Sequence, residues 1–85
     1  MTTRFRVKYI IVESMEIETP VVFNELIQHK TIAGFQRVVG AGFCYVSIDS
    51  GKWVCFGESV SLGVKSREKN DADILNHFIP LTNAG

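Results

Sequence analysis

Basic and apolar side chains alternate along residues 4–12, RFRVKYIIV, until the segment ends in an apolar run. Alternation combined with β-branched and aromatic residues is typical of a strand, and the closing apolar run indicates an end that is buried on both faces. The basic side carries Arg4, Arg6 and Lys8, of which Lys8 lies nearest to the buried end. We therefore predict a first strand over residues 4–12, followed by an acidic connector.

The segment after this connector has the apolar spacing of a helix. The Thr-Pro pair at residues 19–20 is typical of a helix cap followed by the first helical position. Phe23, Leu26 and Ile27 then recur with the i, i+3, i+4 spacing of an amphipathic helix. These features predict a helix over residues 20–32.

Three shorter segments rich in aromatic and β-branched residues follow, at residues 35–39, 43–48 and 53–57. The sequence DSGK at residues 49–52 is a good turn and predicts that the last two segments form a hairpin. If the ends of this turn pair, Val46 faces Cys55. In that register Cys44 and Cys55 share one face of the hairpin without opposing each other.

A second amphipathic helix is predicted over residues 71–79, with Asn70 as its cap and Pro80 preventing much extension. The order of these elements, with apolar residues on both faces of the hairpin, predicts an α/β (α+β) fold. We expect a single mixed β-sheet of four to five strands with one helix on each face. Eighty-five residues are too few for two independent cores, so we predict one domain over residues 1–85.

Composition narrows the class of protein further. A hydrophobic fraction of 46% predicts an ordered core, and nine basic against nine acidic residues give no net charge. A balanced charge argues against a protein whose main work is to hold nucleic acid. No apolar run approaches the roughly 18–20 residues that span a bilayer. Two cysteines are too few for a disulfide framework. We therefore expect a cytoplasmic protein with reduced thiols that binds neither nucleic acid nor a membrane.

The loop FGESVSLG, at residues 56–63, is the strongest candidate for a functional site. Glycine and serine leave backbone N–H groups uncovered, and uncovered N–H groups bind anions. Glu58 interrupts the small residues, where it either orients a cation or an amine or points to solvent. We expect phosphate or another small anion as the ligand. The predicted ligand-binding residues are Lys8, Gly57, Glu58, Ser59, Ser61 and Gly63.

Residues that could carry out a reaction are few in this sequence. His29 and His77 are expected to face solvent on their helices, because nothing near either one in the sequence tunes it. Cys44 and Cys55 are expected to be buried structural cysteines. The sequence has no HxH, HxxE or CxxC motif, so we predict no metal site and no cofactor.

Three short motifs occur together in this chain: VKYII at residues 7–11, GAG at residues 40–42 and FGESVSLG at residues 56–63. With these motifs the chain resembles a short, divergent member of the Janus/ocnus protein phosphohistidine phosphatases. That family has a Lys-Tyr pair in its first strand, then a glycine-rich turn, a hairpin and a Tyr-Gly-x-Ser-x-x-x-Gly loop. The resemblance covers roughly residues 5–80 and includes a helix that ends near a proline, here Pro80.

The resemblance implies a mixed sheet between two helices. It also implies that Lys8 contacts phosphate and that Ser59 and the backbone of Ser61 hold it. The family's catalytic histidine begins the first helix, and the position aligned with it here is Phe23. The family's arginine after the glycine turn is aligned with Phe43. A phenylalanine can neither accept a phosphoryl group nor move a proton, so we expect a chain that keeps the phosphate site and lacks the catalyst.

Three functions are therefore compared. The first is a non-catalytic binding module that recognises a phosphate or carboxylate, on a small ligand or a phosphorylated protein, through Lys8 and residues 57–63. The second is a small phosphatase or phosphotransfer protein in which His29 or His77 has taken over the catalytic role. The third is a subunit that pairs through an exposed sheet edge, with a homo-oligomer as one such assembly.

Overall fold

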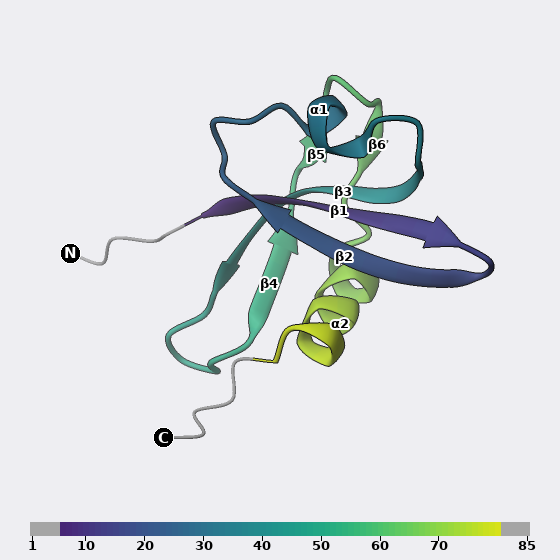
Figure 1. Ribbon diagram of the computed structural model, residues 1–85. Coiled ribbons are helices and arrows are strands. Elements are labelled where there is room, and N and C mark those ends of the chain that lie inside the picture. The colour runs from purple at the N-terminus through teal and green to yellow at the C-terminus, as the bar shows by residue number, and fades with distance from the viewer. Residues whose placement is uncertain (1–5, 81–85) are drawn as a thin grey trace.

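The computed structural model describes residues 6–80, which form two small sheets and two helices (Figure 1). The elements in chain order are β1 (Val7–Ser14), β2 (Ile17–Phe23), α1 (His29–Ala33), β3 (Arg37–Val46), β4 (Trp53–Phe56), β5 (Glu58–Ser59), β6 (Val64–Lys65) and α2 (Glu68–Phe78). Four strands form the main sheet in the order β2-β1-β3-β4, and β5 pairs with β6 in a second sheet. The predicted α+β class is confirmed, although every strand pair is antiparallel.

The helix predicted over residues 20–32 is wrong. Residues 20–23 of that segment belong to β2, which pairs with β1 along its whole length. The helix α1 begins only at His29 and includes residues 29–33. The β-branched Val21 and Val22 pack on opposite faces of the sheet, so this segment buries apolar groups on both sides as a strand does. The sequence of the turn between β1 and β2 did not indicate a hairpin. Its central residues, Met15 and Glu16, take positive φ angles of 53° and 66°, at positions where glycine or asparagine is usual.

The main sheet is covered by one helix on each face, as predicted. One apolar cluster joins Leu75 of α2 to Tyr9 and Ile11 of β1. The other joins Ala33 of α1 to Ile10 of β1 and to Ala41 of β3. Figure 1 shows α1 above the sheet and α2 below it. Because successive residues of β1 point to opposite faces, this strand contributes to both cores.

The glycine turn expected at residues 40–42 is an interior part of the long strand β3. Gly40 is required there because a Cβ atom would collide with the Asp71 carboxylate of α2. The register predicted for the next hairpin is also wrong. Cys44 lies directly opposite Cys55, because the loop is longer than the DSGK turn and closes with a hydrogen bond from Ser47 N to Lys52 O.

The second helix is longer than predicted and begins at Glu68, so Asn70 lies inside it and Arg67 occupies the N-cap position. Asn76 on this helix covers the outer edge of β4. Its side-chain oxygen accepts a hydrogen bond from Trp53 N at 2.9 Å. Among the helices of residues 6–80, none combines the length and apolar character needed to cross a membrane.

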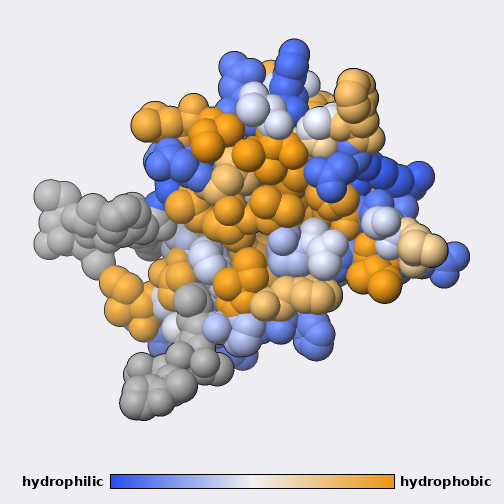
Figure 2. Space-filling view, in the orientation of Figure 1, coloured by the Kyte–Doolittle hydropathy of each residue, from blue (hydrophilic) through white to orange (hydrophobic). Residues whose placement is uncertain are grey.

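Large apolar side chains also remain on the surface of the described residues. The most exposed are Met15, Leu26, Phe35, Ile48 and Val60. Figure 2 shows hydrophobic groups, in orange, gathered over the middle of the molecule where β1 and β2 run in Figure 1. One of these residues, Val60, lines the cleft described next.

Candidate functional site

A cleft of about 250 Å³ opens on the α1 side of the main sheet. It is bounded by β1, β3, the start of α1 and the loop after β5. The lining residues are Lys8, Gln28, His29, Phe43, Glu58, Val60 and Ser61. Three of the predicted ligand-binding residues, Lys8, Glu58 and Ser61, are therefore brought together, although they come from segments about fifty residues apart in the chain.

His29 is the residue that the sequence analysis placed wrongly. It is the first residue of α1 and only 4% of its surface is exposed, so it is not a solvent-facing histidine. Its imidazole lies edge-on to the rings of Phe23 and Phe43, with ring centres 5.5 Å and 5.9 Å away. The apolar spacing from which the helix was predicted gave no information about these contacts with His29.

The hydrogen bonds of His29 decide which nitrogen carries the proton. Nε2 lies 2.8 Å from the carbonyl oxygen of Gly42, which can only accept, so Nε2 carries the hydrogen and donates it. Burial lowers the pKa of His29, and the positive charge of Lys8 acts in the same direction against the opposing effect of the Gly42 carbonyl. The ring is therefore neutral near pH 7, with a lone pair on Nδ1.

The nitrogen that carries this lone pair belongs to a residue that lines the cleft. Every fully buried side-chain nitrogen or oxygen in the described part of the chain has a hydrogen-bond partner. Nδ1 of His29 takes part in none of the hydrogen bonds found within residues 6–80, so it cannot be fully buried. The cleft is thus lined by a neutral imidazole that is held through one nitrogen and has no hydrogen-bond partner for the other within residues 6–80.

Lys8 provides a positive charge in the same cleft. Its Nζ donates one hydrogen bond to the carbonyl oxygen of Ile27, at 2.9 Å. An ammonium group has three N–H donors, so two remain for a ligand. The bond to Ile27 also fixes the loop that leads into His29 beside the lysine.

The loop at residues 57–63 is less open than predicted. Ser59 is buried, and its hydroxyl accepts a hydrogen bond from Leu62 N. Gly63 N donates to the carbonyl oxygen of Ser59. Gly57, Ser59 and Gly63 consequently shape the loop and do not line the cleft. The N–H groups of Val60 and Ser61, which do lie in the cleft-lining part, have no acceptor among residues 6–80.

Glu58 adds a negative charge to the cleft. It is exposed and lies opposite Lys65 in the short β5–β6 pair, which places opposite charges on neighbouring strands. A carboxylate at this position weakens the binding of an anion but also offers an acceptor for a protonated amine. Both roles considered for Glu58 from the sequence therefore stay open to experiment.

The remaining candidates for chemistry lie outside the cleft. His77 is exposed on α2, on the other side of the sheet. Cys44 and Cys55 are buried, and this burial raises the pKa of each thiol to about 12. Such thiols are protonated and unreactive at neutral pH. Within residues 6–80, no group of three or more histidine, cysteine or carboxylate side chains could hold a metal ion.

Four residues that line the cleft were not among the predicted ligand-binding residues: Gln28, His29, Phe43 and Val60. His29 was considered only as a catalyst in the alternative function, and Phe43 only as the position aligned with the family's arginine. The pairing of β3 with β1 places Phe43 opposite Lys8. No local pattern indicates that the residues before α1 fold over this pair. Comparisons of the chain with protein families, with curated proteins and with solved structures each find no match.

Proposed function

We propose that the cleft binds a phosphoryl group and that His29 accepts or activates it, so that the protein acts as a small phosphotransfer protein or phosphatase. The observation that carries this proposal is the neutral, buried imidazole of His29, held by Gly42 in the same cleft as Lys8. A positioned base or nucleophile whose second nitrogen is fixed by another group is the usual arrangement in such catalysis.

The residues of the cleft can attract a phosphoryl group, bind its oxygens and react with it. Lys8 attracts the anion and neutralises part of its charge. The N–H groups of Val60 and Ser61 are candidates to bind its oxygens. Nδ1 of His29 then either takes a proton from a water that attacks phosphorus or itself forms the new bond to phosphorus. In both cases the bond between phosphorus and the leaving group breaks, and the leaving atom, an imidazole nitrogen when the substrate is phosphohistidine, keeps the electron pair. Nε2 of His29 keeps its proton and its bond to Gly42, and the His29 imidazole becomes cationic.

The resemblance to phosphohistidine phosphatases supports the same residue once the observed helix is used. The resemblance aligned the family's catalytic histidine with Phe23, which lies in β2, whereas α1 begins at His29. The family's catalytic histidine begins the first helix, so that position now falls on His29. Phosphohistidine, on a cytoplasmic protein or peptide, is therefore the substrate that we propose first.

A second function, non-catalytic recognition of a phosphate group, is favoured by one observation. Phe43 lines the cleft where the resemblance leads us to expect an arginine, and Glu58 brings a negative charge beside it. These residues would reduce the stabilisation of a transferring phosphoryl group. Pairing through a sheet edge has less support, because Asn76 covers the edge of β4 and Pro20 interrupts the donors of the edge strand β2.

The experiment follows a phosphohistidine peptide by ³¹P NMR in the presence of the protein. We expect the phosphohistidine signal to be replaced by inorganic phosphate, and His29→Gln to slow this at least about 100-fold. His77→Gln is the matched control, because it removes the other histidine from an exposed site, and it should act as the wild type does.

Three other outcomes discriminate between the functions. An intact substrate, together with amide shifts at Ser61 that Lys8→Gln abolishes, would favour non-catalytic recognition. Turnover that survives His29→Gln would contradict the role of His29. Neither turnover nor amide shifts at millimolar phosphohistidine peptide would contradict both functions.

A further inference from the structure

Arg6 is a second cation at the cleft that the proposed function does not use. Its guanidinium lies 4.6 Å from the centre of the Phe43 ring, on the residue that forms part of the cleft wall. Phe43 is also the register partner of Lys8 across the β1–β3 pair. Arg6 and Lys8 are two residues apart, so they project to the same side of the extended chain. Arg6 therefore lies beside Phe43, a residue of the cleft wall, on the same side of the chain as Lys8.

The present partner of Arg6 holds it weakly. Nε donates to Oε2 of Glu25 at 3.3 Å, and the two side chains are 52% and 40% exposed. Within residues 6–80 the two terminal nitrogens of Arg6 have no acceptor. Arg67 is different, because its guanidinium nitrogens donate to carboxylate oxygens of both Glu18 and Asp71. The two terminal nitrogens of Arg6 are thus available to donate parallel hydrogen bonds to two oxygens of a phosphate.

We infer that Arg6 is the second phosphate-binding cation of the cleft, and that Glu25 holds it until a doubly charged phosphate displaces this carboxylate. The inference rests on the proposed binding of a phosphoryl group and names the charge state that the site selects. Lys8 alone attracts any anion, including a carboxylate. Lys8 and Arg6 together favour a phosphate dianion over a singly charged group, because only the dianion compensates Arg6 for the loss of Glu25.

Two charged groups oppose this selectivity and set its size. Glu58 lines the cleft, and Glu25 competes directly for Arg6. His29 is neutral and adds no charge of its own. Removing the competitor should therefore strengthen phosphate binding, whereas removing Arg6 should weaken it. If Arg6 were only a solvent-exposed side chain with no part in binding, substitution of Glu25 or of Arg6 would leave phosphate affinity unchanged.

The test is a titration of the amide resonances of Val60 and Ser61 with inorganic phosphate and, separately, with acetate at constant ionic strength and pH 7.5. We expect Arg6→Gln to weaken phosphate binding about five- to tenfold and acetate binding by less than about twofold. Glu25→Gln should strengthen phosphate binding about two- to threefold. The matched control is Arg37→Gln, which removes an arginine that pairs with Glu13 at the other end of β1.

Lys8→Gln separates this inference from the proposed function. If it weakens the binding of both anions while Arg6→Gln behaves like Arg37→Gln, the role of Arg6 is wrong and phosphate binding at the cleft stands. If Lys8→Gln changes neither affinity, the proposed site itself is wrong. If Arg6→Gln weakens acetate and phosphate equally, Arg6 adds attraction without selecting the dianion, and the inference fails.

Discussion

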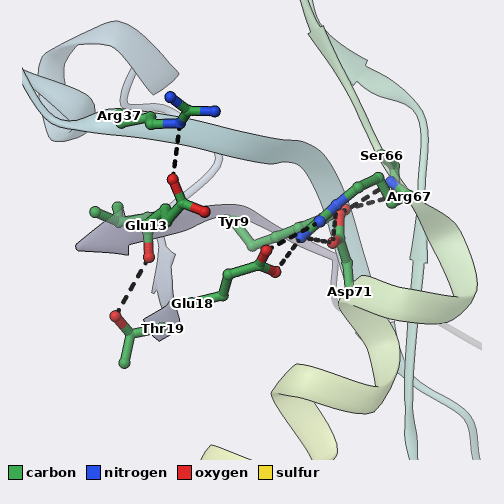
Figure 3. A network of polar contacts seen from close by, with 9 residues as sticks. Tyr9, Glu13, Glu18, Thr19, Arg37, Ser66, Arg67 and Asp71 are labelled. Carbon is green, nitrogen blue, oxygen red and sulfur yellow. Dashed lines mark hydrogen bonds and ion pairs between the residues drawn. The ribbon is translucent and has the colours of Figure 1, made fainter. Parts of the chain in front are cut away.

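Lys8 and Tyr9 are neighbours on β1, yet they enter two polar sites that are built in opposite ways. Tyr9 donates its hydroxyl proton to Asp71 at 2.6 Å and, having no second proton, accepts one from Ser66. Asp71 also accepts hydrogen bonds from the backbone and the side chain of Arg67. Figure 3 shows these groups pointing toward one another between the sheet and α2. In this site each charged or polar group is fully engaged.

In the cleft on the other face of the sheet, some hydrogen-bond donors and acceptors remain unpaired within residues 6–80. Lys8 uses one of three donors, and His29 uses one of two ring nitrogens. Unsatisfied polar groups are costly where water is excluded, so the buried network has to be complete, whereas an open cleft can leave groups to solvent or to a ligand. A polar cluster in which every group is paired is therefore structural, whereas a cluster that is held in place but keeps unpaired donors or acceptors is a candidate site.

The largest effect expected from this comparison is on stability, at Asp71. Asp71→Ala leaves the Tyr9 hydroxyl and the Arg67 guanidinium without an acceptor and opens space against Gly40. We expect a loss of about 2–4 kcal/mol in the free energy of unfolding, moderated because Arg67 keeps Glu18 and is partly exposed. Chemical denaturation followed by tryptophan fluorescence measures it.

The control for Asp71 is on the same helix. Asp73 is paired with Lys69 at the surface, and Asp73→Ala should change the free energy of unfolding by less than about 0.5 kcal/mol. At temperatures where the variant remains folded, Asp71→Ala should leave phosphate affinity at the cleft unchanged. Equal effects of the two substitutions, or a loss of phosphate binding in folded Asp71→Ala, would remove the distinction between the two sites.

The contrast between the two sites also explains which parts of the molecule could be predicted from sequence. The apolar run in β1 indicated burial on both faces, and the amphipathic pattern of residues 71–79 predicted most of α2, because both signals are local. The strand β2 was missed since Thr-Pro followed by Phe23 and Leu26 fits a helix equally well. The choice was made by pairing with β1, a contact that no local pattern encodes.

The same limit applies to the candidate site. Lys8, Glu58 and Ser61 were identified because each belongs to a recognisable local motif, and all three line the cleft. His29 was wrongly expected to face solvent, because its burial depends on Gly42 and Phe43 of β3, which lie outside the local sequence pattern around it. The register predicted for Cys44 and Cys55 was wrong for a related reason. The length of the hairpin loop is set by hydrogen bonds within the folded loop, such as the one from Ser47 N to Lys52 O.

A smaller effect is expected from pH, and it should come from the cleft. Burial lowers the pKa of His29 in the folded state below the ordinary value of about 6.5. As the pH falls through that ordinary value, the unfolded chain binds a proton that the folded chain does not. The stability contributed by neutral His29 is therefore complete above about pH 6.5 and is lost progressively at lower pH.

The measurement compares the free energy of unfolding at pH 7.5 and at pH 5. The decrease should be smaller in His29→Gln than in the wild type, and His77→Gln should match the wild type. The pKa of Glu18 is also lowered, by Arg67, but that carboxyl changes the stability at more acidic pH. A decrease that is unaffected by His29→Gln would show that the imidazole is not held in the neutral form.

The smallest effect is expected at Glu58, where the comparison predicts a change in binding without a change in stability. Its carboxylate lines the cleft, is exposed, and repels an anion held by Lys8. Glu58→Gln should therefore raise the affinity for inorganic phosphate about two- to threefold and change the free energy of unfolding by less than about 0.5 kcal/mol. Glu68→Gln, at an exposed position on α2, controls for the change in net charge.

If both substitutions raise the affinity for phosphate equally, the gain is a long-range charge effect. If Glu58→Gln weakens binding while Glu68→Gln does not, the carboxylate contributes to the site as a hydrogen-bond acceptor, and the ligand carries a donor beside its phosphate.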